Sequence, residues 1–224
     1  MSEESDFKVA VDATVAEKVP SVVVSKSDIP SRIESMGILS RIVRTITHFF
    51  FDTVETLVVA LSIFVVVYLF VAQPHEVKGS SMEPSFYSNE YILTDKLSYK
   101  FRSPERGDVI VFKSPTNPDL DYIKRVIGLP GDKVKVEKGY VYVNGLELQE
   151  PYLKDQTFLS PSNMLKEGVE ITVPEGFYFA MGDNRPNSSD SREFGPISGK
   201  SIVGRAIFRY WPISELGLVS HVTY

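Results

Sequence analysis

The feature that most constrains this chain is an uncharged, mostly apolar run, TLVVALSIFVVVYLFVA, at residues 56–72. As a helix it would be about 26 Å long, close to the ~30 Å thickness of a bilayer's hydrocarbon core. A soluble helix with Val, Leu and Phe on every face would need burial all round, which a chain of 224 residues rarely provides. A cleaved signal peptide fits no better, because the run begins more than 50 residues from the start and lacks an A-x-A site. The run therefore predicts a transmembrane anchor.

The charges on either side of this run predict its direction. Arg41 and Arg44 precede it, whereas only Lys78 follows closely, so the positive-inside rule places the N-terminus in the cytoplasm. No other run reaches 17 uncharged residues, so we expect a single-pass plasma-membrane protein. Its three expected parts are a flexible cytoplasmic tail at 1–37, a juxtamembrane helix and anchor at 38–73, and an extracytoplasmic domain at 74–224.

After residue 74 the sequence changes to short alternating runs typical of β-strands. KG at 138–139 and NG at 144–145 predict tight hairpins, while prolines break 149–170, which we expect to be an inserted loop region. The predicted fold is mainly β, an antiparallel sheet or barrel behind one N-terminal transmembrane helix. Trp211 is expected to pack in the core or else to contact lipid headgroups. The expected strands are VIVFK (109–113), YIKRVIG (122–128), VKVE (134–137), YVYV (140–143) and AIFRYW (206–211).

Composition excludes several classes of function. A formal net charge of −5 argues against a nucleic-acid partner. Because there is no cysteine, the chain has no disulfide, thiolate nucleophile or zinc–thiolate site. The three histidines, His48, His75 and His221, are too scattered to suggest a metal site, so we expect neither a metal nor another cofactor.

The stretch GSSMEP, 79–84, presents two hydroxyls in a turn bracketed by glycine and proline. Most serines in such places, here Ser80 and Ser81, cap or hydrogen-bond the turn. A serine nucleophile would also need a base to remove its proton. From these residues alone, His75 or His221 could be that base.

A lysine whose pKa is lowered by burial is the other base available to a serine. In DYIKRVIG, 121–128, alternation places Lys124 on one face of a strand with Tyr122 and Val126. If that face is buried, desolvation disfavours the ammonium form of Lys124. If both faces are wet, Lys124 and Arg125 only solubilise an edge strand.

A third stretch, GDNRPNSSDSREFG at 182–195, is dense in Asp, Asn, Arg and Ser. It is typical either of a polar surface loop or of a hydrogen-bonded platform that orients a site. In the second case its charges would neutralise one another and leave serine hydroxyls to orient a neighbour.

Together these stretches resemble the type I signal peptidases, membrane-anchored serine proteases with a Ser-Lys dyad and a β-rich catalytic domain. The resemblance implies that Ser81 is the nucleophile, that Lys124 is the general base, and that Ser188 orients the lysine. The matching blocks, in the family's order, are GSSMEP (79–84), RGDVIVFK (106–113), DYIKRVIGLPGD (121–132) and GDNRPNSSDSR (182–192). The residues expected to support the site structurally are Arg125, Asp183, Arg185, Asp190 and Arg192.

One position departs from part of this family. Some members have a serine two places before the nucleophile, whose hydroxyl assists the oxyanion hole, and here that place is Gly79. The oxyanion would then rely on backbone N–H groups, most directly that of Ser81, and glycine would let the chain approach the substrate closely.

The resemblance implies secretory preproteins as substrates, cleaved after small residues at the first and third positions before the cut. We expect the cleavage region to bind as an added strand between 75–80 and 121–124, with Val77, Tyr122 and Ile123 in contact with it. Two alternatives remain: a noncatalytic membrane-anchored β module, and a related self-processing Ser-Lys peptidase.

Overall fold

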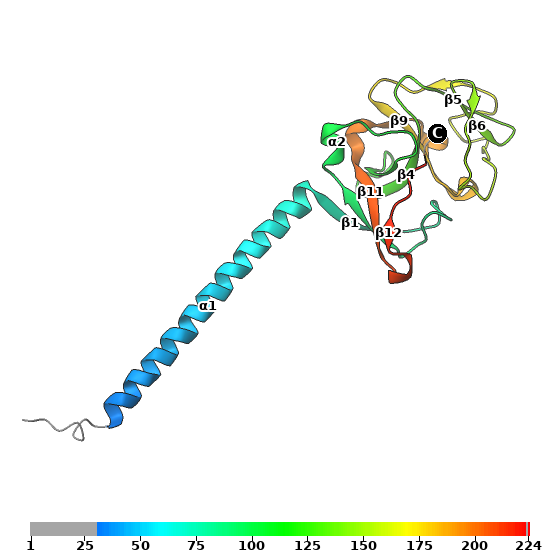
Figure 1. Ribbon diagram of the computed structural model, residues 1–224. Coiled ribbons are helices and arrows are strands. Elements are labelled where there is room, and N and C mark those ends of the chain that lie inside the picture. Colours follow the sequence, from blue (N-terminus) through cyan, green and yellow to red (C-terminus); the bar gives the residue numbers. More distant parts are fainter. Residues whose placement is uncertain (1–30, 223) are drawn as a thin grey trace, which may run out of the picture. The chain divides into compact units, whose positions relative to one another are not determined.

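The computed structural model describes residues 31–222 and 224. The chain divides into two compact units that meet between Val58 and Val59, within the first helix, α1 (Ser31–Phe70). The first unit holds the N-terminal part of this helix. The second unit holds its last turns and every strand of the described residues (Figure 1).

The helix α1 is continuous through both the predicted juxtamembrane segment and the predicted anchor. It begins at Ser31, so the last residues of the predicted tail are helical, and residues 1–30 of that tail lie outside the described part of the chain. The anchor was also predicted to extend to residue 73, but strand β1 already begins at Ala72. Residues 72–73 pair with β2 instead of extending the helix.

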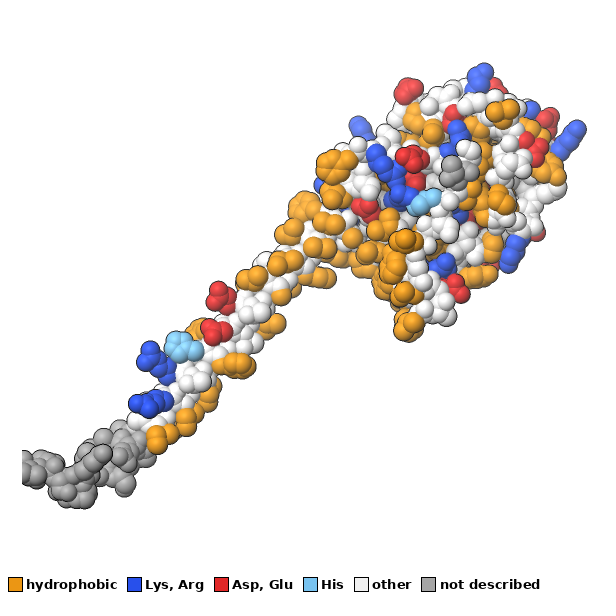
Figure 2. All heavy atoms as spheres, in the orientation of Figure 1, with side chains coloured by type: hydrophobic (Ala, Val, Ile, Leu, Met, Phe, Trp, Pro, Cys, Tyr) orange, Lys and Arg blue, Asp and Glu red, His pale blue; other side chains and the backbone are white. Residues whose placement is uncertain are grey.

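Exposed apolar side chains follow α1 from Ile38 to Phe70, beside charged side chains in its N-terminal half (Figure 2). Within the segment Gly37–Phe70 an 18-residue window reaches a mean hydropathy of 2.3, and among the described residues this is the one helix long and apolar enough to cross a membrane. None of its most apolar window is buried, which distinguishes it from the core helix of a soluble protein. Where the uncharged run begins, the Thr56 hydroxyl donates to the Asp52 carbonyl at 2.8 Å, so this polar group is satisfied within the helix.

The second unit is built on two antiparallel sheets. The larger has the order β1-β2-β11-β3-β4-β9-β10, with β12 paired to β11, and the smaller has the order β7-β6-β5-β8. The larger sheet contains β1 (Ala72–Glu76), β2 (Tyr91–Asp95), β3 (Val109–Lys113), β4 (Asp121–Gly128), β9 (Phe177–Met181), β10 (Ile197–Ser198), β11 (Ile202–Trp211) and β12 (Gly217–Leu218). The smaller contains β5 (Lys133–Glu137), β6 (Tyr140–Val143), β7 (Leu146–Glu147) and β8 (Ile171–Thr172). Short helices connect strands along the chain: α2 (Ser98–Phe101), η2 (Arg185–Asn187), α3 (Ser191–Phe194), η3 (Gly199–Ser201) and η4 (Ile213–Glu215).

The five predicted strands are confirmed as β3, β4, β5, β6 and β11. Both predicted hairpin turns form, since Lys138, Gly139, Asn144 and Gly145 all have positive φ between 52° and 83°. Strand β1, AQPHE, was not predicted, because it contains a proline and shows little alternation of apolar and polar residues. Proline is tolerated there because β1 is an edge strand of its sheet.

Strand β3 explains how the central sheet is buried on both faces. Val109 and Val111 belong to one hydrophobic cluster, whereas Ile110 and Phe112 belong to another. A third cluster joins β4 and β9 to the smaller sheet and is closed by Leu165, from the inserted region 149–170. The insertion is therefore part of the core rather than a loose loop.

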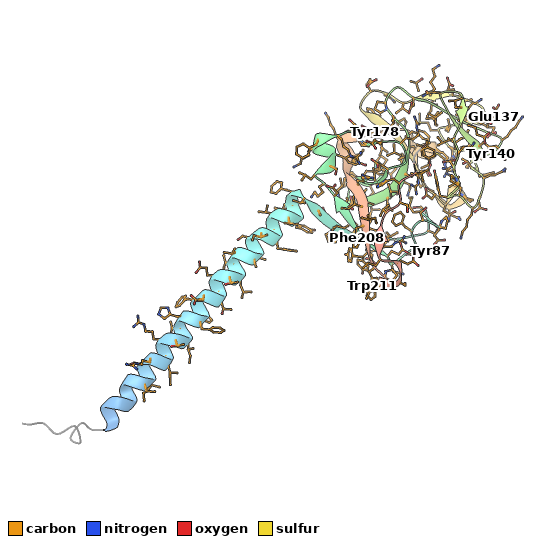
Figure 3. All side chains as sticks on the ribbon, viewed as in Figure 1. Tyr87, Glu137, Tyr140, Tyr178, Phe208 and Trp211 are labelled. Carbon is orange, nitrogen blue, oxygen red and sulfur yellow. The ribbon has the colours of Figure 1, made fainter. Side chains whose placement is uncertain are left out.

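Trp211 ends strand β11 and is 51% exposed, so the expectation that it packs in the core is wrong (Figure 3). The exposed apolar side chains that follow it in the sequence are Ile213, Leu216 and Leu218.

Candidate active site

The turn that carries Ser81 is held by two buried side chains. Met82 and Phe86 both insert into the hydrophobic core, and the Phe86 N–H donates to the Met82 carbonyl at 2.9 Å. Gly79 enters the turn with φ of +85°, a conformation that side-chain-bearing residues rarely adopt. The turn therefore presents Ser81 half-buried beside strand β4.

Lys124 lies on β4 and reaches Ser81. Its Nζ donates to Ser81 Oγ at 2.8 Å and to the Ile123 carbonyl at 2.9 Å. The residue is only 4% exposed, and this burial lowers the pKa of Lys124 from its ordinary value to about 8, while Asp190 and Asp183 oppose the shift. Of the two interpretations of β4, the structure supports the buried one: Tyr122 and Val126, on the same face, pack with one hydrophobic cluster.

Neither histidine considered as a base contacts Ser81 by a hydrogen bond. His75 Nδ1 lies 3.0 Å from Thr94 Oγ1, and its Nε2 lies 3.5 Å from an Asp121 carboxylate oxygen. His221 faces Asp108 at 3.4 Å. Lys124 is thus the titratable side chain that hydrogen-bonds Ser81.

Behind the lysine lie buried ion pairs. Arg125 donates two hydrogen bonds to Asp183, at 2.9 and 2.6 Å. Arg192 does the same to Asp190, at 2.8 Å each, and these bonds lower the pKa of Asp190 although burial alone would raise it. Two carboxylates, each paired with an arginine, therefore lie behind Lys124.

The remaining arginine of the 182–195 block has a partner that the sequence reasoning missed. Arg185 pairs with Glu150, which lies in the inserted region, rather than with an aspartate of its own block. The insertion also supplies the Phe158 carbonyl to Arg192 at 2.9 Å. The insertion therefore braces the charged loop that faces Lys124.

Two further residues of this loop touch the serine turn and were also missed. Asn184 donates from its side chain to the Ser80 carbonyl and from its backbone to the Ser81 carbonyl, both at 3.0 Å. Gly182 packs so tightly that a Cβ there would clash with the Ser81 carbonyl and with Ser188 Oγ. No sequence signal marks these contacts, because they join segments about 100 residues apart.

Ser188, predicted to orient the lysine, lies beside Gly182 with its hydroxyl buried. Its Oγ makes no hydrogen bond of good geometry within the described chain, although it lies near enough to Asp190 to help lower that carboxyl's pKa. The described hydrogen bonds of Lys124 do not include it, so its predicted role stays a prediction.

A cleft of about 560 Å³ opens beside Ser81 and Lys124. One wall is β1 with Val77, and the other is the start of β4 with Tyr122 and Ile123. Strand β1 is the edge of its sheet, and β9 pairs with β4 only from Arg125 onward. Both walls therefore offer unpaired strand edges to the cleft.

The backbone N–H of Ser81 has no hydrogen-bond partner in the described chain, whereas that of Gly79 donates to Ser88 Oγ at 3.3 Å. A Cβ at Gly79 would meet nothing within 4 Å, so its positive φ rather than lack of space requires glycine.

For metals, no group of three His, Asp or Glu side chains within residues 31–222 is arranged to hold an ion.

Comparisons with known proteins agree on one family. The chain matches the family model described as "Signal peptidase, peptidase S26" over residues 50–211. It is 38% identical to a "Probable signal peptidase I-2" of Synechocystis sp., over 74% of this chain and 75% of that one. It is also 38% identical to a "Signal peptidase IB" of Staphylococcus aureus, over 73% and 91%. A crystal structure of a signal peptidase I from Enterococcus faecalis is 36% identical, covers 46% of this chain and 97% of its own, and has a TM-score of 0.38.

Proposed function

The chain belongs to the signal peptidase family, peptidase S26, and on that premise we propose that it removes signal peptides from preproteins with Ser81 as nucleophile and Lys124 as general base. The observation that carries the assignment is the 2.8 Å distance between Lys124 Nζ and Ser81 Oγ. Burial lowers the pKa of this lysine, so its neutral form is accessible as a base. Such a pair meets the two requirements of nucleophilic catalysis, an adjacent base and a presented hydroxyl.

The reaction begins when neutral Lys124 accepts the proton of Ser81 Oγ, which attacks the carbonyl carbon before the cut. The resulting ammonium donates that proton to the leaving amide nitrogen as the C–N bond breaks, and an ester to Ser81 remains. Lys124, neutral again, removes a proton from water, which attacks the ester. As the ester C–O bond breaks, the Lys124 ammonium returns this proton to Ser81 Oγ, the signal peptide leaves with a new C-terminal carboxylate, and neutral Lys124 and Ser81 are restored.

Asp183 and Asp190 stabilise the ammonium form of Lys124 by their negative charge. They do not act on the substrate, because each is buried and paired with an arginine. Their charges oppose the effect of burial on Lys124, and the balance leaves its pKa near neutrality. The unpaired N–H of Ser81 points to a backbone oxyanion donor in place of the missing hydroxyl at Gly79. Ser188, whose buried Oγ lies beside Asp190, is assigned the role of orienting Lys124.

Substrate binds in the cleft as an extended segment, hydrogen-bonded to the free edges of β1 and β4. Main-chain pairing explains how many preproteins are accepted, because it makes no demand on side chains. Selectivity for small residues is assigned to the shallow apolar wall formed by Val77, Tyr122 and Ile123.

The enzyme is membrane-associated, as its apolar helix and its family indicate. We assign the N-terminus to the cytoplasm and residues 74–224 to the extracytoplasmic side as the catalytic domain, on the strength of Arg41 and Arg44. Anchoring enzyme and preprotein in one membrane raises their effective concentration.

The test is cleavage of a purified preprotein by the full-length enzyme in detergent. Ser81→Ala should abolish cleavage, while the matched variant Ser80→Ala should keep it. Retained cleavage by Ser81→Ala would reject the nucleophile. A wild-type protein that binds the preprotein without cutting it would instead favour the noncatalytic module.

A further inference from the structure

A second cavity, of about 810 Å³, lies at the end of α1 and away from the active-site cleft. Leu69 and Phe70, the last residues of the helix, form one part of its wall. The segments around α2 and η3 form other parts of the wall and contribute basic side chains: Lys96, Lys100, Arg102 and Lys200. The one carboxylate in the wall is that of Glu175.

Three of these cations lack a counter-ion. Arg102 is committed to Asp108 and Glu105, at 3.2 and 3.4 Å. Lys96 donates only to a neutral amide oxygen, that of Gln73. Lys100 and Lys200 are exposed, and within residues 31–222 they form no ion pair. In a chain with a net charge of −5, this cavity concentrates unmatched positive charge.

The helix sets the depth of this cavity in a bilayer. From Thr56 to Phe70 the helix is uncharged, a length of about 22 Å at 1.5 Å per residue, against a hydrocarbon core of ~30 Å. Because the helix ends at Phe70, this residue lies at the boundary of the hydrocarbon, and Lys100 beside it lies at the level of lipid phosphates.

The surroundings of Lys100 support contact with a bilayer. Its Nζ lies 5.6 Å from the centre of the Phe70 ring, at the C-terminal end of α1. The next residue, Phe101, is 83% exposed, and Leu97 on the preceding turn is also exposed. An exposed phenylalanine between two cations matches an interface where rings enter the acyl region and cations meet phosphates.

We propose that this cavity binds the phosphate of an anionic phospholipid headgroup, with Lys96, Lys100 and Lys200 as its ligands. The lipid supplies the charge that the protein lacks there, and it fixes the depth of the second unit at the bilayer surface. The inference rests on α1 crossing a membrane, and it is independent of which residues cleave the substrate.

The experiment measures lipid binding, not cleavage. Full-length protein in a nonionic detergent is titrated with dioctanoyl phosphatidylglycerol, and bound lipid is counted by native mass spectrometry. Dioctanoyl phosphatidylcholine serves as the zwitterionic comparison, and inorganic phosphate is added as a competitor. The variant is Lys100→Gln with Lys200→Gln, and its control is Lys133→Gln with Lys154→Gln, which removes equal charge elsewhere.

We expect wild type to bind phosphatidylglycerol more tightly than phosphatidylcholine. Each lysine near an anionic lipid surface strengthens binding about fivefold, so the double variant should bind phosphatidylglycerol on the order of 25-fold more weakly. The control pair and the charge-preserving pair Lys100→Arg with Lys200→Arg should match wild type. Equal binding by the Lys100→Gln, Lys200→Gln variant would overturn the site. Displacement by inorganic phosphate at the same concentration would overturn the lipid as its ligand.

Discussion

The pH dependence of cleavage tests the state of Lys124 directly. The reaction needs the neutral amine, so activity should be lost as pH falls through the pKa of Lys124, which burial lowers to about 8. At that pKa about 9% of the enzyme is active at pH 7 and about 91% at pH 9, a roughly tenfold rise. An ordinary lysine with a pKa near 10.5 would instead give a rise of about 100-fold over the same range, with no plateau.

The assay is kcat/KM for a fluorogenic peptide with alanine at the first and third positions before the cut, measured between pH 6 and 10.5. Since kcat/KM reports the free enzyme, its midpoint gives the pKa of Lys124 before substrate binds. Lys124→Arg keeps the charge but cannot become neutral, so it should lose about 10²- to 10⁴-fold at every pH. A profile that still climbs steeply at pH 10, or an active Lys124→Arg enzyme, would refute the buried-amine account.

Three further predictions concern the residues around the dyad. Asn184→Ala removes the donor to the Ser80 carbonyl and should lower kcat about tenfold with little change in KM, as measured with the same peptide. Glu150→Ala leaves the buried Arg185 guanidinium unpaired and should lower the free energy of unfolding by about 3–5 kcal/mol, measured by denaturant titration. Gly182→Ala should displace the serine turn and reduce kcat about 100-fold, since its Cβ would clash with the Ser81 carbonyl.

Each of these has an outcome that contradicts it. An unchanged kcat in Asn184→Ala would mean that its backbone N–H alone holds the turn. For Glu150→Ala the matched control is Asp155→Ala, which removes an exposed carboxylate of the same insertion. Equal stability of the two variants would show that the Glu150–Arg185 pair does not stabilise the fold. A Gly182→Ala enzyme with wild-type kcat would show that the turn tolerates the displacement.

The strands that can be predicted from a sequence are those whose own residues reflect their surroundings. Strand β3, VIVFK, is continuously apolar because both of its faces are buried, and the hairpin at 138–139 is marked by its glycine. Strand β1 carries no such mark, because an edge strand that lines a cleft can hold Pro74 and His75.

The site divides in the same way. Ser81 and Lys124 could be proposed from a turn, a strand and a family resemblance, but their contact joins residues 43 positions apart, and the burial of Lys124 depends on tertiary packing. Asn184 and Glu150 could not be found at all, because their partners are far apart in the sequence and both residue types are common on surfaces. Trp211 shows the reverse error, an aromatic residue expected inside that lies outside.

Covalent labelling of the nucleophile tests the central claim most directly. Full-length protein is incubated with a peptide-like β-lactam that acylates serine, then digested and analysed by mass spectrometry. We expect one adduct per chain, on Ser81, formed faster as pH rises through about 8 and absent from Ser81→Ala. An adduct on Ser80, or labelling of Ser81 that is unaffected by Lys124→Arg, would contradict it.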